Sequence, residues 1–79
     1  MESIRYSMSP TDIEYKIKKM ILELRHIRVE RGLSQREIAD IIGVRKGTIS
    51  DMENFKYMPR MDLVFKYASA LGYKVELTL

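Results

Sequence analysis

Two short amphipathic segments separated by Gly43 constrain the fold of this chain more than any other feature. The run SQRE, from Ser34 to Glu37, is a capping box: the serine serves the amide three residues on and the glutamate reaches back, so a helix is predicted to begin at Gln35. This helix is predicted to end at Gly43, and a third helix of the chain follows it. The inward-facing residues of the two segments are Ile38, Ala39, Ile42, Val44, Ile49 and Met52.

Further helices are predicted on both sides of this pair. Ser9-Pro10-Thr11-Asp12 supplies an N-cap serine, a proline suited to the first helical position and an acid for the first turn. The helix that it opens is expected to run to about Arg31 and stop at Gly32. Its core stripe is Ile13, Ile17, Met20, Ile21, Leu24, Ile27 and the stem of Arg28. A last helix is expected from roughly Met61 to Leu71, with Gly72 as its stop. Its inward-facing residues are Met61, Val64, Tyr67, Ala68 and Leu71.

Both ends of the chain alternate apolar and polar residues, as half-buried strands do. Residues 1–8 form a predicted N-terminal strand or arm, and residues 73–79 form a predicted C-terminal strand. Two lone short strands would each be marginal, so we expect them to pair with each other, with a second subunit, or both. The expected fold class is mainly α, with four to five helices and short β-strands at the N- and C-termini.

Composition limits the classes of function. The chain has 79 residues, no cysteine and one histidine, His26, so we expect one domain over residues 1–79, no catalytic site, no metal site and no cofactor. The net charge of +3 favours an anionic partner only mildly. No apolar run is long enough to span a membrane, and the first residues, MESIRYSM, lack the apolar segment of a signal peptide. We therefore expect a cytoplasmic binding protein rather than an enzyme.

The residues from Gln35 to Glu53 resemble the helix-turn-helix of the Cro and phage-repressor type, also called the XRE family. Such a pair of helices needs a small residue at the crossing, here Ala39, and a glycine in the turn, here Gly43. The residues that carry the resemblance are Gln35, Ile38, Ala39, Ile42, Gly43, Val44, Thr48, Ile49, Ser50, Met52, Glu53 and Asn54. It extends from about Met20 to Leu71 and implies a repressor-like domain whose recognition helix enters the major groove of double-stranded DNA.

The resemblance also implies which residues contact DNA. The outward face of the recognition helix, which would meet the base edges, carries Arg45, Lys46, Gly47, Ser50 and Asp51. Lys46 is the strongest candidate among them, because lysine donates to guanine O6 and N7. The positions that match phosphate contacts are Gln35, Arg36, Thr48, Asn54 and Lys56. For Arg36, and for Arg60 as a further candidate, a solvated surface role is about equally expected.

Gly47 and Asp51 are unusual on a face that reads DNA. Gly47 costs about 0.5 to 1 kcal/mol of helix stability relative to alanine. We expect it to let the helix lie closer to the bases or to leave room for a thymine methyl group. Asp51 repels phosphates, but it can accept from a cytosine amino group or hold Arg45 or a neighbouring lysine in place. Both features also fit a helix whose DNA reading is weak.

Other positions matter for structure and for partners. Arg28 and Glu53 match an arginine and a glutamate that form a partly buried ion pair in the family. Phe55 replaces the glycine expected after Glu-Asn, so the left-handed turn common there is in doubt. Leu22, Val29 and Leu63 are apolar at positions that are usually polar in the family. Leu22 and Val29 also belong to the set of residues that we assign to a dimer or partner interface. That set is Tyr15, Leu22, Val29, Tyr73, Val75, Leu77 and Leu79.

With terminal strands added, the arrangement is similar to the HipB-like and HigA-like antitoxins. In those proteins, dimers form partly through terminal strands, repress their own operon and bind a toxin. The implied function is a homodimeric, sequence-specific repressor on a palindromic operator, with residues 73–79 as a dimerisation strand. The alternative is an antitoxin whose main role is to bind and neutralise a toxin protein.

Overall fold

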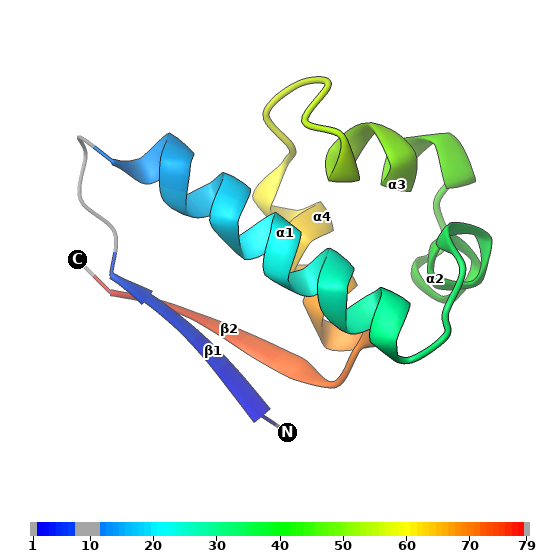
Figure 1. The fold of residues 1–79 in the computed structure, drawn as a ribbon, viewed down its shortest axis with the longest axis horizontal. Coiled ribbons are helices and arrows are strands. Elements are labelled where there is room, and N and C mark those ends of the chain that lie inside the picture. The colour runs from blue at the N-terminus through cyan, green and yellow to red at the C-terminus, as the bar shows by residue number, and fades with distance from the viewer. Residues whose placement is uncertain (1, 8–11, 79) are drawn as a thin grey trace.

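The computed structural model describes residues 2–7 and 12–78 of the chain. Within them the elements are β1 (Glu2–Ser7), α1 (Ile13–Glu30), α2 (Gln35–Ile42), α3 (Lys46–Glu53), α4 (Met61–Ala70) and β2 (Tyr73–Thr78). The mainly α fold class with a strand at each end is therefore confirmed. In Figure 1, α1 crosses in front of α4, while α2 and α3 lie at one end of the molecule and the two strands lie toward the other.

The predicted beginning and end of α2 are confirmed in atomic detail. The Glu37 amide donates to Ser34 Oγ over 3.0 Å, and the Ser34 amide donates to Glu37 Oε1 over 3.2 Å. Gly43 ends the helix in the left-handed region, at φ 86°. The start of α1 differs from the prediction: Asp12 is its N-cap and makes no side-chain cap hydrogen bond. The expected cap at Ser9 to Thr11 lies outside the described residues.

The core lies between the helices and one face of the sheet. Its buried apolar residues are Ile4, Ile17, Met20, Ile21, Leu24, Ile38, Ala39, Ile49, Met52, Val64, Tyr67, Ala68 and Leu71. The prediction that Ile13 belongs to this core is wrong, since Ile13 is 45% exposed. The physical reason is that the first turn of α1 extends beyond the helices that pack against it (Figure 1). Leu63 is half-buried against the core, which leaves little of it for a partner.

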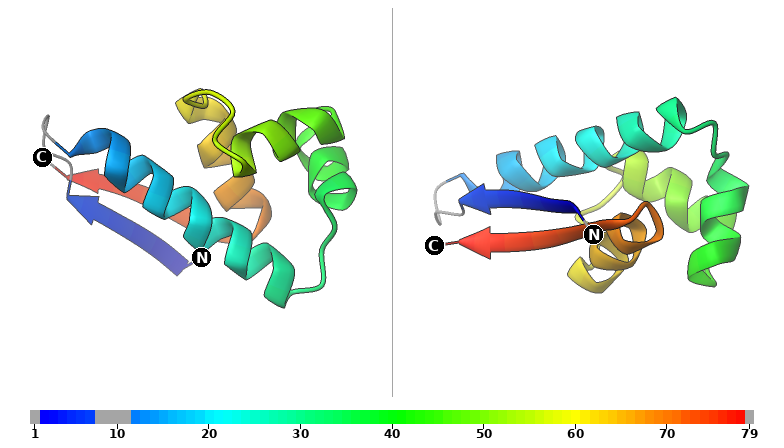
Figure 2. Two further views of the ribbon diagram at one scale, coloured as in Figure 1. Left: turned by 45° about the horizontal axis from the view of Figure 1, so that its top comes forward. Right: turned by 90° about the horizontal axis from the view of Figure 1, so that it is seen from below.

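The two terminal strands pair with each other, which was one of the expected alternatives. They run parallel, in a register from Glu2 opposite Tyr73 to Ser7 opposite Thr78. One face of the sheet carries Ile4 to the core, while Glu76 on the other face accepts from Arg5 Nε over 2.7 Å. Figure 2 shows in both views that this sheet lies away from α2 and α3.

Side chains of β2 serve the chain's own core. Tyr73 and Val75, which we assigned to an interface between subunits, are half-buried and pack against the core of their own chain. Arg31 at the end of α1 donates to the Leu71 carbonyl and lies over the Tyr73 ring, 5.3 Å from its centroid. The side chain of Leu77 and the whole of Leu79 lie outside the described part of the chain.

The turn after α3 is left-handed although it carries a phenylalanine. Phe55 has φ 55°, so the left-handed turn that the sequence put in doubt is present. The Phe55 amide donates to the Met52 carbonyl and the Lys56 amide donates to the Asp51 carbonyl, over 3.2 and 3.0 Å, which is the hydrogen bonding of a Schellman motif. The ring of Phe55 packs against the core, and this burial offsets the cost of the unfavourable backbone conformation.

None of the helices within residues 2–7 and 12–78 has both the length and the apolar character needed to cross a bilayer.

Candidate nucleic-acid interface

The outward face of α3 carries the predicted base-contacting residues. Lys46 and Gly47 are exposed in the first turn of the helix, whereas Ser50 and Asp51 are half-buried one turn later. Arg45 is exposed but is the N-cap residue, so it precedes the helix instead of lying on its face. Its extended backbone, at φ −76° and ψ 148°, places it in the turn between α2 and α3. The exposed cations therefore gather at the N-terminal end of α3.

Gly47 leaves an open space on this face. A Cβ atom built at Gly47 meets nothing within 4 Å, so no packing inside the chain requires a glycine at this position. Its φ is not in the left-handed region either, in contrast to Gly32, Gly43 and Gly72. Neither packing nor backbone conformation within the chain therefore explains the glycine at this position.

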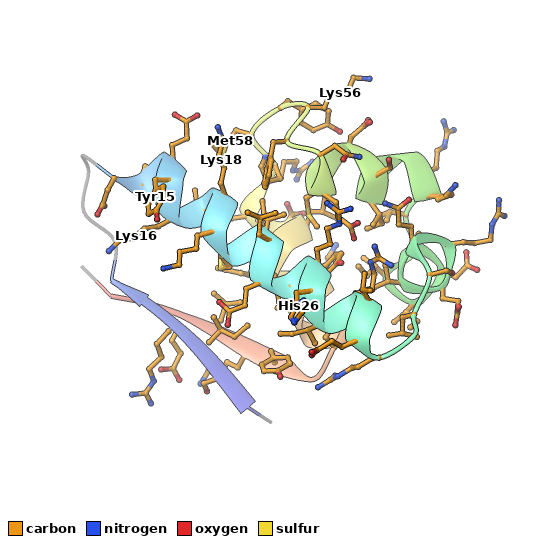
Figure 3. The ribbon with its side chains drawn as sticks, in the orientation of Figure 1. Tyr15, Lys16, Lys18, His26, Lys56 and Met58 are labelled. Carbon is orange, nitrogen blue, oxygen red and sulfur yellow. The ribbon has the colours of Figure 1, made fainter. Side chains whose placement is uncertain are left out.

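The predicted phosphate-contacting residues are only partly free to meet DNA. Arg36 is exposed on α2, and Thr48 is half-buried at the groove that α3 forms with the start of α4. Asn54 caps the end of α3, since its Nδ2 donates to the Ser50 carbonyl over 2.8 Å. Lys56 projects from the loop after α3 (Figure 3), with its Nζ 3.9 Å from Asp51 Oδ1.

A buried carboxylate, Glu53, joins α3 to the other three helices. Arg28 of α1 donates from Nε to Glu53 Oε2 over 2.8 Å and from Nη2 to Oε1 over 2.9 Å, so the structure brings the predicted ion pair together in bidentate geometry. Tyr67 of α4 donates its hydroxyl to Oε2 over 2.6 Å. Gln35 of α2 donates from Nε2 to Oε1 over 3.0 Å. Charge-assisted hydrogen bonds of this kind fix the orientation of α3 relative to the rest of the fold.

The pKa of each member reflects this burial. Burial alone would raise the pKa of the Glu53 carboxyl, but the hydrogen bonds from Arg28, Tyr67 and Gln35 hold it below its usual value. Burial, together with the hydrogen bond to Glu53, raises the pKa of the Tyr67 hydroxyl well above its usual value. The hydrogen bond to Glu53 also raises the pKa of Arg28. The carboxylate is thus ionised and the phenol neutral at neutral pH.

Gln35 is the first residue of α2, and its side chain belongs to the Glu53 network. Its side-chain amide donates to Glu53, and the Glu37 amide of the same turn donates to Ser34 Oγ. An anion at this helix N-terminus would therefore meet the amides that precede Glu37. Arg25, which the sequence reasoning did not select, lies beside Gln35: Arg25 Nε is 3.8 Å from Glu53 Oε1 and its side chain is half exposed. Its spacing of three residues before Arg28 is the signal that would have placed it on this side of α1.

The role of Tyr67 was also missed. The apolar spacing of the last helix correctly placed Tyr67 in the core, where it is fully buried. A buried tyrosine hydroxyl usually finds a hydrogen-bond partner, and that rule was the available signal. The partner itself could not be identified, because Glu53 lies on a different helix.

The part of the chain that the structure describes contains no group of three or more histidine, cysteine, aspartate or glutamate side chains placed to hold a metal ion.

Comparison with known proteins identifies the family to which these four helices belong. The helix-turn-helix family model matches residues 24–77. An uncharacterized HTH-type transcriptional regulator of Archaeoglobus fulgidus is 35% identical over 57 residues, which cover 72% of this chain and 81% of that protein. A second, from Methanocaldococcus jannaschii, is 37% identical over 68% of this chain and 82% of its own length. A third, from Methanothermobacter thermautotrophicus, is 41% identical over 62% of this chain and 71% of its own length.

No solved structure matches the chain significantly. The family model covers the end of α1, all of α2, α3 and α4, and most of β2, so it includes every helix that contributes to the Glu53 network. The chain belongs to the XRE-type helix-turn-helix family.

Proposed function

We propose that this protein is a sequence-specific DNA-binding repressor that acts as a homodimer on a palindromic operator. The observation that carries the proposal is the position of α3, whose first turn exposes Lys46 and Gly47 while its last residue, Glu53, is 1% exposed and bonded to the other helices. A rigidly held helix with a cationic, sterically open end is suited to enter the major groove.

The chemistry of this end favours direct reading of bases. Lys46 is suited to donate to guanine O6 and N7, and Gly47 lets the backbone approach the base edges closely. Asp51, which lies near the ammonium of Lys56, is available to a cytosine amino group once Lys56 turns to a phosphate. Arg36 and the N-terminus of α2 supply sequence-independent contacts to the backbone.

A dimer would present two such helices about 34 Å apart, in successive major grooves of a palindromic site. Two features support a second copy as the partner. Tyr15, Leu22 and Val29 are 65%, 49% and 58% exposed on α1, and large exposed apolar side chains in a small protein favour an interface. The sheet, which has two strands within the described residues, lies away from α3, so pairing at its edge would leave the reading helices accessible.

The test compares two substitutions on two DNA duplexes, one from upstream of the protein's own gene and one scrambled. Lys46→Ala should weaken binding to the native duplex by about 1 to 3 kcal/mol and binding to the scrambled duplex far less, because it removes a base contact. Arg36→Ala, the matched control on α2, should weaken both duplexes alike and reduce the salt dependence. Equal losses on both duplexes for Lys46→Ala would refute base reading by this residue.

The same exposed stripe on α1 favours a second candidate, an antitoxin that holds a toxin. Figure 3 shows Tyr15 and His26 on one face of α1, and no element of the described chain covers that face. Coexpression with the product of an adjacent gene distinguishes the two functions. A stoichiometric complex that Leu22→Glu abolishes would support the antitoxin, and its absence would leave the repressor alone.

A further inference from the structure

A cavity of about 190 Å³ opens between the first half of α1 and the loop that joins α3 to α4. Its apolar part is formed by Ile17 and Ile21 of α1 with Phe55 and Pro59 of the loop. Ile21 is fully buried, and Ile17 and Pro59 are buried as well, so these walls are held by the core. An apolar cavity of about 150 Å³ is large enough to hold benzene. The space therefore suits one aromatic ring with a small substituent.

The rim of the cavity exposes two large side chains. Tyr57 and Met58 line the cavity and are 52% and 49% exposed. Figure 3 shows Met58 next to Lys18 of α1, which lines the same cavity. An apolar ligand would remove part of this rim from water, and that burial favours binding in proportion to the area covered.

The charges at the rim favour a neutral ligand. Glu14 and Lys18 both line the cavity and pair with each other, with Oε1 and Nζ 3.4 Å apart. A charged ligand of either sign would meet one like and one unlike charge, so the pair gives it no net attraction to offset the cost of burying its charge. A neutral molecule with one hydroxyl or ring N–H can donate to the Glu14 carboxylate without breaking this pair.

We propose that this cavity binds a neutral, ring-sized apolar molecule of the phenol or indole class, and that its occupancy alters the loop after the recognition helix. Phe55 connects the two events, because its ring lines the cavity while its left-handed backbone forms the turn that ends α3. The next residue, Lys56, is hydrogen-bonded through its amide to Asp51 of α3. An effect on DNA affinity rests on the proposed function, whereas binding and the response of the loop do not.

The experiment follows backbone amides of the isotope-labelled, DNA-free protein during titration with p-cresol and with indole. We expect saturable shifts at Ile17, Ile21 and Phe55, with a smaller response that reaches Asp51 and Lys56. Benzoate and benzylamine, which carry the same ring with a negative or a positive charge, should bind about tenfold more weakly because charge is costly to bury there.

Two variants test the location. Met58→Ala and Tyr57→Ala each remove an exposed part of the rim, so they should fold normally and weaken p-cresol binding by about fivefold. Phe65→Ala, which removes an exposed aromatic side chain on α4 outside the cavity, should leave binding unchanged. Shifts that do not saturate, or that Phe65→Ala reduces as much as Met58→Ala does, would overturn the site. Saturable shifts that stop short of Asp51 and Lys56 would overturn its link to α3.

Discussion

Glu53 holds α3 in a fixed position relative to the other three helices. Its carboxylate receives donors from Arg28, Tyr67 and Gln35, which belong to three different helices. Removing one partner of such a buried pair leaves an uncompensated charge, at a cost of roughly 3 to 5 kcal/mol. The sequence predicted the Arg28–Glu53 pair through the family resemblance, but the other two donors required the three-dimensional packing of α2 and α4.

The lowered pKa of Glu53 predicts a loss of stability in acid. The unfolded carboxyl, with a pKa near 4.5, takes up a proton before the folded one does, so the free energy of unfolding falls as the pH drops below about 4.5. Tyr67→Phe removes one of the hydrogen bonds that lower this pKa. The substitution should therefore lower the free energy of unfolding by about 1 to 3 kcal/mol at neutral pH. It should also make the further decrease of this free energy toward acid pH smaller.

Urea unfolding followed by circular dichroism between about pH 7 and 3 measures both effects. Tyr15→Phe is the matched control, since Tyr15 is exposed and its hydroxyl takes no part in the Glu53 network. An identical pH dependence for Tyr67→Phe and the unmodified protein would contradict the role given to the Tyr67 hydroxyl.

Local sequence rules predicted most of the helices and strands. They failed where contacts between distant parts of the chain determine burial or backbone conformation. The capping box at Ser34 and the left-handed Gly43 fixed α2 correctly, because both signals act within a few residues. The burial of Ile13 was predicted wrongly, because spacing on a helix does not show where the packing partners end. The sequence put the left-handed turn at Phe55 in doubt because phenylalanine replaces the expected glycine. The burial of its ring, which depends on contacts outside the turn, could not be predicted.

Replacing Gly47 should change the stability of the protein and its affinity for DNA in opposite directions. Gly47→Ala should raise the free energy of unfolding by about 0.5 to 1 kcal/mol, because the added methyl group meets nothing within the chain and alanine favours the helix. The same methyl group should weaken binding to operator DNA if the helix lies close to the bases. Thermal unfolding and fluorescence anisotropy measure the two effects.

Ser69→Ala on α4 is the control for Gly47→Ala, since Ser69 is an exposed helical position away from α3. It should change stability only slightly and leave DNA affinity unaltered. A Gly47→Ala protein that binds operator DNA as tightly as the parent would show that Gly47 does not provide a close approach.

In the whole molecule, the parallel pairing of β1 with β2 places the first and the last strand of the chain side by side (Figure 1). The sequence could not distinguish this from pairing between subunits, because alternation gives the period of a strand but not its neighbour. Since Tyr73 and Val75 pack on their own core, we now expect α1 to supply most of the side-chain surface for a dimer.

Leu22→Glu tests this arrangement. A charge in the middle of the exposed stripe should shift the protein from dimer to monomer at low micromolar concentration, because a desolvated carboxylate is costly in an apolar interface. Sedimentation velocity measures the change. Lys66→Glu, an exposed substitution on α4, should leave the sedimentation coefficient unchanged. A Leu22→Glu protein that sediments like its parent would exclude the α1 stripe as the dimer interface.

We expect α3 to read a specific DNA sequence. Fluorescence anisotropy of the unmodified protein tests it most directly, on DNA from upstream of its own gene and on a scrambled duplex, each at two salt concentrations. We predict binding to the native sequence that is at least about 10³-fold tighter than binding to the scrambled one and that falls steeply as salt rises. Equal and weak binding to both duplexes would contradict the claim and would identify α3 as a helix that no longer reads DNA.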